Sequence, residues 1–211
     1  MFRITYQVRT HLECVQMGWE EWQQAMQTAI PVVSEIRREY KAYLDTGDET
    51  HRKKADNLKK KLPGACFQAS DFAESTGDDP RTKYNYGKTG RWREMRYAYL
   101  SGLVVIDVDH CGNPREVFGR IQQEHDLKAE GILLVYVSAR GEGMKIVFKA
   151  RPAEQWGNLI CQQYEMASLL GILDFVDESC KDSNRLSWIT GPDDVLYCDS
   201  KELFNVEPQN D

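Results

Sequence analysis

The spacing of hydrophobic residues predicts a mostly helical amino-terminal lobe, residues 1–63. Residues 2–8 alternate between apolar and polar side chains, which is typical of a strand with one buried face. Across residues 19–44 apolar side chains recur at steps of three and four, which predicts a helix. Pro31 falls inside this pattern, so we expect it to kink the helix or to start a second one. The basic segment 49–62 also has helical composition and ends at a Pro-Gly pair.

The rest of the chain, residues 64–211, alternates between strand and helix patterns and forms the predicted core. The apolar run 103–106 follows Gly102 and predicts a strand that is buried on both faces. Because the apolar segments 131–138 and 144–149 flank a short glycine-containing loop, they predict a β-hairpin. Shorter strands are predicted at 66–70 and 186–190, and helices at 114–124 and 152–171. The predicted fold class is α+β, with a mainly antiparallel sheet and a helical amino-terminal lobe.

The buried strand ends in two acids, Asp107 and Asp109. Because they are two residues apart, they share one face of an extended chain, while Val108 points the other way. Two carboxylates at the rigid end of a central strand suit a divalent cation that prefers oxygen ligands, such as Mg²⁺. The alternative is that both acids belong to an ordinary strand-to-loop turn.

Charge is distributed unevenly along the chain. The formal net charge is −6, which argues against indiscriminate binding to nucleic acid. Residues 51–61 and residues 81–96 each carry six Lys or Arg against one acid, and 15 basic and 31 acidic residues remain outside them. The positive charge is therefore confined to two patches.

The second basic patch also contains aromatic residues. Cations hold phosphate and flat rings stack on bases, so this combination is typical of a surface that binds single-stranded nucleic acid. The alternative is a solvated loop whose aromatic rings anchor it to the core. The candidate nucleic-acid-binding residues are Lys83, Tyr86, Lys88, Arg91, Trp92, Arg93 and Arg96.

The loop of the predicted hairpin is a second candidate site. Gly141 and Gly143 allow backbone N–H groups to approach a phosphate, Ser138 offers a hydroxyl, and Arg140 and Lys145 offer positive charge. A glycine-bearing hairpin turn needs no ligand, however, so the loop taken alone favours an ordinary turn. A third element, Asp177 to Arg185, places acids and a base ahead of the strand at 186–190. Taken alone, that segment is equally a turn with surface ion pairs.

The order of these elements resembles the archaeo-eukaryotic primase superfamily. That superfamily has a metal-binding Asp-x-Asp, then a nucleotide-binding Ser-x-His-type motif, then a third metal-binding acid. Within it, the chain looks closest to the VirE-type amino-terminal domain family of bacterial primase-polymerase-like proteins. The resemblance runs from Lys61 to Leu186, about two-thirds of the chain.

The resemblance implies an RRM-like catalytic core. It also implies that the protein is a primase-polymerase, which is a DNA primase or polymerase that performs template-dependent nucleotidyl transfer. It makes Asp107, Asp109 and Asp177 the catalytic ligands of Mg²⁺ or Mn²⁺, and it makes Ser138, Lys145 and Arg185 contacts to phosphate. Nucleoside triphosphates and a single-stranded DNA template are the implied ligands, and a helicase or other DNA replication proteins are implied partners. Lys145 stands where archaeal and eukaryotic primases have His, and a fixed cation still holds phosphate.

Two other functions remain open. One is a non-catalytic nucleic-acid-binding domain of replication or mobile-element proteins, and the other is a metal-dependent nuclease. The amino terminus lacks a signal-peptide pattern and no apolar run is long enough to span a membrane, so we expect a cytoplasmic protein without a membrane partner. Because the six cysteines form no Cys-x-x-Cys pair, reduced thiols are expected; the only zinc candidate is His110-Cys111 with Cys180.

Overall fold

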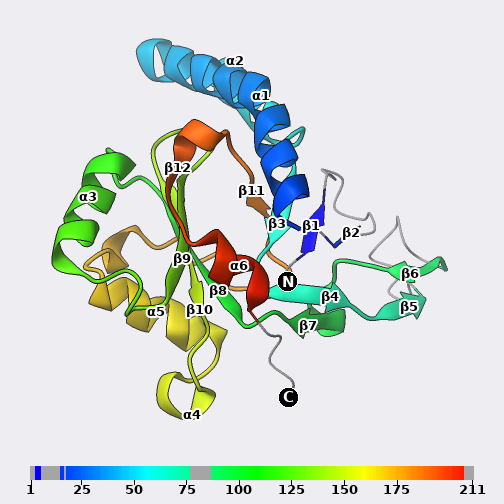
Figure 1. Cartoon of the computed structure of the whole chain (residues 1–211). Coiled ribbons are helices and arrows are strands. Elements are labelled where there is room, and N and C mark those ends of the chain that lie inside the picture. Colours follow the sequence, from blue (N-terminus) through cyan, green and yellow to red (C-terminus); the bar gives the residue numbers. More distant parts are fainter. Residues whose placement is uncertain (1–2, 6–14, 17, 77–86, 207–211) are drawn as a thin grey trace.

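A computed structural model describes residues 3–5, 15–16, 18–76 and 87–206. It confirms the α+β class: helices and antiparallel sheets make up the molecule (Figure 1). The α-helices are α1 (Trp19–Thr46), α2 (Glu49–Lys59), α3 (Pro114–Glu124), α4 (Ala153–Trp156), α5 (Leu159–Leu169) and α6 (Ser200–Asn205). The larger strands are β8 (Leu103–Val108), β9 (Ile132–Val137), β10 (Met144–Lys149) and β12 (Val195–Cys198).

Those four strands form the central antiparallel sheet, in the order β12-β9-β10-β8. Strands β9 and β10 are the predicted hairpin, and β10 lies between β9 and β8. Because β8 and β9 both run antiparallel to β10, they are parallel to each other, and α3 makes the crossover between them. Beyond β8, Val108 forms an isolated antiparallel bridge with Val176.

The central sheet is covered on both faces. On one face, Val104 and Ile106 of β8 pack with Phe118 of α3 and Met166 of α5, and Figure 1 shows both helices on that side. On the other face, Leu103 and Val105 pack with Trp22 of α1 in a second cluster. Burial on both faces explains why β8 is a nearly continuous apolar run. Asp107 follows the alternation of Leu103 and Val105, so it belongs to the face without α3 and α5.

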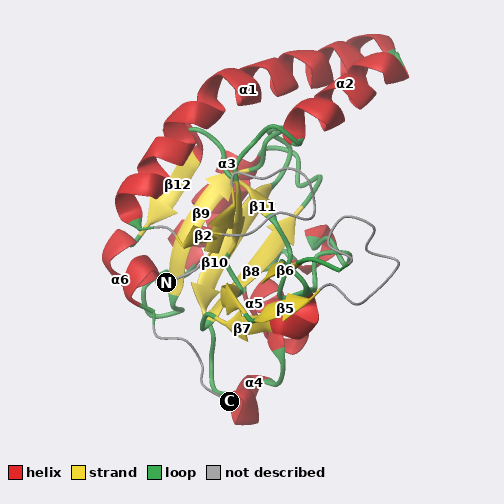
Figure 2. Cartoon of the chain, turned by 90° about the vertical axis from the view of Figure 1, so that its right-hand side faces the viewer, coloured by secondary structure: helices red, strands yellow, loops and turns green. Residues whose placement is uncertain are grey.

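Helices α1 and α2 form an antiparallel pair that extends beyond the sheet (Figure 2). The predicted helix at 19–44 is confirmed as α1, which continues through Pro31 as one helix along a curved path. Tyr40 of α1 and Leu58 of α2 are buried in a cluster that also includes Ala139 of the β9–β10 loop. The lobe therefore packs against the hairpin loop of the core.

Smaller sheets complete the described part of the chain. One has the order β11-β3-β1-β2, and the other two are the pairs β4-β7 and β5-β6. Their bounds are β1 Arg3–Thr5, β2 Val15–Gln16, β3 Gly64–Cys66, β4 Ala69–Phe72, β5 Glu74–Thr76, β6 Thr89–Arg91, β7 Ala98–Leu100 and β11 Ser187–Trp188. Short 3-10 helices cover Met95–Tyr97, Leu173–Phe175 and Pro192–Asp194. Among the described residues, no helix has the length and apolar character needed to cross a bilayer.

The single helix predicted at 152–171 is wrong, because the chain forms α4 and α5 instead. Gly157 has a φ of +68° and ends α4, and the side chain of Asn158 accepts hydrogen bonds from the backbone N–H groups at the start of α5. Within α5, Ala167 is buried as an apolar residue, but Gln162 and Gln163 are buried as well, whereas Ile160 is 38% exposed. The Gln162 side chain bonds to the backbone of Arg151 and Gly157, whereas Gln163 bonds to backbone carbonyls near the candidate site.

Candidate active site

The bridge between Val108 and Val176 brings two distant acids together. The backbone N–H of Asp177 donates to the carbonyl of Asp107 at 2.8 Å, and the N–H of Asp109 donates to the carbonyl of Phe175 at 2.8 Å. Asp177 is thereby fixed beside the last residues of β8. The strand order makes this contact, although 70 positions separate the two acids in the sequence.

Cys180 completes a compact group with these two acids. Ligand atoms of Asp107, Asp177 and Cys180 all lie within 4.8 Å of one another. The Cys180 sulfur is 3.0 Å from a carboxylate oxygen of each acid, so its one proton is shared between two acceptors. Burial, the charge of Asp107 and these hydrogen bonds raise the pKa of the Cys180 thiol to about 12, so it is a neutral donor at pH 7.

The carboxylate of Asp177 remains ionised at neutral pH. Burial works to raise its pKa, but hydrogen bonds from Cys180 and Ser179, together with the charge of Arg185, outweigh burial and hold the pKa below its usual value. The guanidinium of Arg185 lies 3.4 Å from the hydroxyl of Ser179. An ionised Asp177 is the form that binds a cation.

Lys145 of β10 lies directly opposite Asp107 of β8 in the antiparallel register. Its ammonium forms an ion pair with the Asp107 carboxylate, and both side chains are largely buried, with 11% and 14% exposed. The lysine predicted to contact phosphate therefore neutralises one of the predicted metal ligands in this structure. A buried pair of this kind is costly to break by removal of one partner.

Asp109 lies after the end of β8 and is exposed. Among the described residues it does not join the group formed by Asp107, Asp177 and Cys180, nor do His110 and Cys111. His110 follows with a φ of +53°, which turns the chain away from the strand direction. Asp109 still lines the same cavity as Asp107 and Asp177, so its role as a metal ligand stays a prediction.

Helix α1 holds the hairpin loop in place. The guanidinium of Arg37 donates to the carbonyl of Ser138 at 3.2 Å, and the hydroxyl of Tyr40 donates to Glu142 at 2.6 Å. Arg140 pairs with Asp56 of α2, and its guanidinium lies 5.0 Å from the centre of the Tyr40 ring. The loop is thus fixed by the lobe, and Arg140 has a carboxylate partner.

Gly143 allows the loop to approach the end of β8. A side chain there would place its first carbon 2.1 Å from the carbonyl oxygen of Val108, which is a steric clash with backbone. Gly141 has a φ of +90°, a conformation that residues with a side chain rarely adopt. The steric clash at Gly143 and the backbone conformation of Gly141 therefore explain both glycines without a ligand.

Two buried glutamines connect β8 to the loop that carries Cys180. The Gln68 amide accepts from the backbone N–H of Val105, and the Gln163 amide donates to the Val105 carbonyl at 2.8 Å. Gln163 also donates to the carbonyl of Cys180, and Gln68 to that of Asp182. Side chains thus take the place of a strand at this edge of β8 and tie it to the loop that carries Cys180. Sequence reasoning missed this network, because glutamine is usually exposed, both on a helix, as for Gln163, and in a turn, as for Gln68.

The basic and aromatic segment is only partly near these acids. Arg91 pairs with Asp71 at 2.6 Å, and Arg96 pairs with Glu94 at 3.2 Å. Arg93 donates to the carbonyl of Asn184, whose side-chain amide donates back to the Arg93 carbonyl at 3.2 Å. Lys88 is exposed, and its carbonyl accepts from the Trp92 indole. Lys83 and Tyr86 lie outside the described residues, so their predicted role stays untested.

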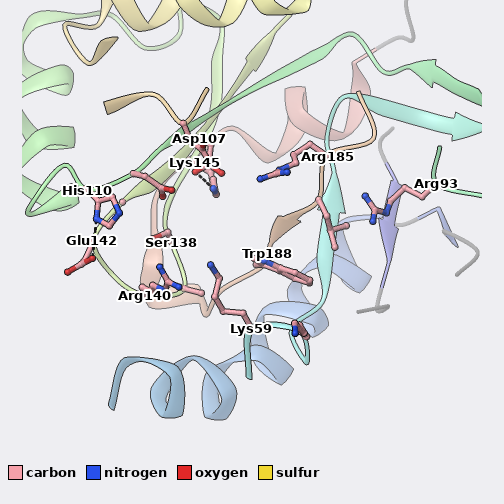
Figure 3. Close-up of a pocket in the computed structure, with 16 residues that line it drawn as sticks. Lys59, Arg93, Asp107, His110, Ser138, Arg140, Glu142, Lys145, Arg185 and Trp188 are labelled. Atoms are coloured by element: carbon pink, nitrogen blue, oxygen red, sulfur yellow. Dashed lines mark ion pairs between the residues drawn. The ribbon is translucent and has the colours of Figure 1, made fainter. Parts of the chain in front are cut away.

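These elements enclose a cavity of about 430 Å³ (Figure 3). Nine predicted site residues line it: Asp107, Asp109, Asp177, Ser138, Arg140, Gly143, Lys145, Arg185 and Arg93. Residues without a predicted role there also line it, among them Lys59, Lys60, His110, Glu142 and Trp188. Acids gather at one side, and Lys59, Trp188 and Arg185 extend into the cavity from other sides (Figure 3). Three of these residues had a signal in the sequence: Lys59 and Lys60 belong to the first basic patch, and His110 was part of the zinc candidate.

The acid group fits a divalent cation in its chemistry. Asp107 and Asp177 would supply the carboxylate oxygens that Mg²⁺ and Mn²⁺ prefer, and Asp109 lines the same cavity. The neutral Cys180 thiol would orient both carboxylates as a hydrogen-bond donor instead of serving as a ligand. Binding requires that the cation compete with Lys145 for Asp107.

A comparison with protein families identifies one relationship. The model of the family described as BT4734-like, N-terminal domain, matches residues 84–197, more than half of the chain. The chain belongs to this family. The BT4734-like match includes β8, the hairpin, Asp177 and Trp188, but it does not include α1, α2 or Lys59. Searches of curated proteins and of solved structures gave no match.

Proposed function

We propose that the protein is a primase-polymerase that transfers nucleotides to a growing strand in a metal-dependent reaction. The observation that carries the proposal is the convergence of Asp107 and Asp177 at the acidic side of a cavity whose other sides are basic. A cation bound there would activate a hydroxyl group and stabilise the departing pyrophosphate. Arg185 and other basic residues of the cavity would hold the phosphates of the incoming nucleotide.

The order of the strands also supports the proposal, because it is compatible with the RRM-like core that the resemblance implies. Taken in space, the Val176 segment, β8, β10 and β9 follow one another, and the chain visits β8, α3, β9, β10, α5 and the Val176 segment in turn. This order would correspond to the split β-α-β pattern of a ferredoxin-like arrangement, with the isolated bridge at Val176 in the place of the last strand. The acids would then lie at the end of β8, on the face of the sheet opposite α3 and α5, where the resemblance to primases implies that template and nucleotide bind.

One observation favours a second function, a non-catalytic nucleic-acid-binding domain. Lys145 already neutralises Asp107, so the charge of this carboxylate is compensated without a metal ion. A domain that had lost catalysis would have no need to release this pair.

Primer extension tests the proposal. The protein is incubated with labelled primer on a single-stranded template, nucleoside triphosphates and Mg²⁺ or Mn²⁺. Products longer than the primer support a polymerase, and shorter products indicate a metal-dependent nuclease. A primer that is shifted on a native gel but unchanged in length indicates the non-catalytic domain. Asp107→Asn is the control, and extension that survives it would show that the activity has another source.

A further inference from the structure

The cavity has a basic side that the acids do not neutralise. Among the described residues, Lys59, Arg93 and Arg185 form no ion pair with a carboxylate within 4.0 Å, although all three line the cavity. Arg93 and Arg185 instead contact a carbonyl and a hydroxyl. The positive charge at this side is therefore available to a ligand.

Lys59 is the most constrained of these cations. It is the last residue of α2, and its side chain is directed into the cavity toward Arg140 and Trp188 (Figure 3). Burial and the positive charges of Arg140 and Lys145 lower the pKa of its ammonium. A half-buried ammonium among other cations is unfavourable until an anion enters.

Trp188 provides a flat apolar surface beside these cations. Its strand β11 pairs with β3, where Trp188 is opposite Gly64. The indole is half-buried, packs against the α1–α2 cluster and lines the cavity. An aromatic face beside cations is the combination that binds a nucleobase and its phosphates.

The volume of the cavity favours a single nucleotide over a nucleic-acid strand as its ligand. At about 430 Å³ it falls in the range of small-molecule sites, roughly 300–1,000 Å³. The lobe closes one side of it, since Lys59 and the α2-bound Arg140 both line that side. One nucleotide fits such an enclosure better than a continuous strand does.

We propose that this cavity binds a nucleoside triphosphate, with Lys59 and Arg185 on its phosphates and Trp188 against its base. This inference rests on the proposed function and deepens it: the helical lobe, which lies outside the family match, supplies part of the nucleotide site. The lobe would then contribute to substrate binding as well as to support of the hairpin loop.

Equilibrium binding of three probes tests the assignment: a nucleoside triphosphate, inorganic triphosphate and a single-stranded oligonucleotide, each with Mn²⁺. Lys59→Met should weaken both triphosphates about tenfold or more, because one charge-assisted contact is lost. Lys53→Met is the matched control, since Lys53 is an exposed lysine of the same helix that does not line the cavity. It should bind all three probes as the wild type does.

Trp188→Leu should weaken the nucleoside triphosphate about tenfold and leave inorganic triphosphate unchanged, because only the former has a base to stack. Trp188→Phe keeps an aromatic ring and should restore binding, which guards against a Leu variant that fails to fold. Unchanged triphosphate binding in Lys59→Met would overturn the assignment. Weaker oligonucleotide binding alone would also overturn it, by showing that the basic side binds strand phosphate.

These results separate the inference from the proposed function. If the variants behave as expected but the wild type does not extend a primer, the nucleotide site stands and the catalytic proposal fails. If the wild type extends a primer but Lys59→Met and Trp188→Leu bind both triphosphates normally, only the nucleotide assignment fails.

Discussion

At the scale of single residues, the pair of Lys145 and Asp107 matters most. The two are cross-strand neighbours, largely buried, and in contact. A cation at Asp107 must displace the ammonium, which is then free to contact phosphate. Cation and triphosphate should therefore bind cooperatively, since each favours the arrangement that the other requires.

Lys145→Met should raise the affinity for Mn²⁺ in the absence of nucleotide. The substitution removes the cation that competes for Asp107 and leaves the largely buried carboxylate without a cationic partner, so we expect a gain of at least about fivefold, roughly 1 kcal/mol. Calorimetric titration with Mn²⁺ measures it, with Lys149→Met, an exposed lysine at the end of the same strand, as the control. Weaker Mn²⁺ binding by Lys145→Met would show that Lys145 supports the cation site instead of competing with it.

Gly143→Ala should disrupt the site through backbone contact alone. The new carbon would lie 2.1 Å from the Val108 carbonyl, so either the loop or the end of β8 must move. We expect a loss of about 1–3 kcal/mol in the free energy of unfolding and weaker Mn²⁺ binding. Chemical denaturation and Mn²⁺ titration measure the two effects.

Gly112→Ala separates steric clash from backbone strain. Gly112 has a φ of +77°, but nothing lies within 4 Å of the added carbon. This variant should lose about 1–2 kcal/mol of stability and keep its Mn²⁺ affinity. Equal Mn²⁺ affinities in Gly143→Ala and Gly112→Ala would contradict the proposed contact between the loop and β8.

At the scale of elements, Glu39 joins α1 to α2. It is buried, and its carboxylate contacts His51 and Lys54 of α2, each at 2.7 Å, as well as Arg38. Hydrogen bonds from Lys54 and His51 lower the pKa of Glu39 to about 2. Because its pKa in the folded state is below the usual 4.5, Glu39 stabilises the fold above about pH 4.5, and this contribution is lost as the pH falls toward 2.

Glu39→Gln should therefore lower the Tm at pH 7 and have a smaller effect at pH 2.5. Thermal unfolding followed by circular dichroism at both pH values measures this difference. Glu35→Gln is the control, because Glu35 is on the same helix but more exposed, and its ion pairs are longer, at 3.4 and 3.8 Å. An equal loss of Tm at the two pH values would show that the Glu39 charge does not join the helices.

Local signals in the sequence predicted some elements well and missed others. The run 103–106 is apolar because β8 is buried on both faces, so its strand and its terminal acids were evident. Gly157 and Asn158 are ordinary helix-end signals, yet the apolar pattern across them predicted one helix. Gln162 and Gln163 are buried although they are polar, because their side chains bond to backbone groups of other segments.

At the scale of the whole molecule, the composition of the site depends on tertiary contacts. Residues alone suggested Asp107 and Asp109 as a pair, but the structure groups Asp107 with Asp177 and Cys180. The bridge between Val108 and Val176 brings this group together. An isolated bridge has no local sequence pattern by which it could be predicted. Lys59 and Trp188 reach the cavity only because the lobe and the β11-β3 sheet both adjoin the hairpin loop. Sequence reasoning supplied candidate residues, and the register of β8 with β10 decided how two of them meet.

Asp182 provides the comparison for Asp177. Its side chain is exposed, and its carbonyl accepts from Gln68 and from the backbone N–H of Arg185. Among the described residues it is not part of the group that could hold a metal ion. Asp177 thus lies beside Asp107 in the candidate metal site, whereas Asp182 of the same loop does not.

The rate of single-nucleotide incorporation in Asp177→Asn and Asp182→Asn is the most direct test of the proposed catalytic site. If Asp177 holds the catalytic cation, Asp177→Asn should lose about 1,000-fold in kcat, because several kcal/mol of transition-state stabilisation disappear. Asp182→Asn should retain kcat within about threefold, with at most a higher KM for the nucleotide. An Asp177→Asn variant that incorporates nucleotides at the wild-type rate, or an Asp182→Asn variant that loses as much as Asp177→Asn, would contradict the assignment.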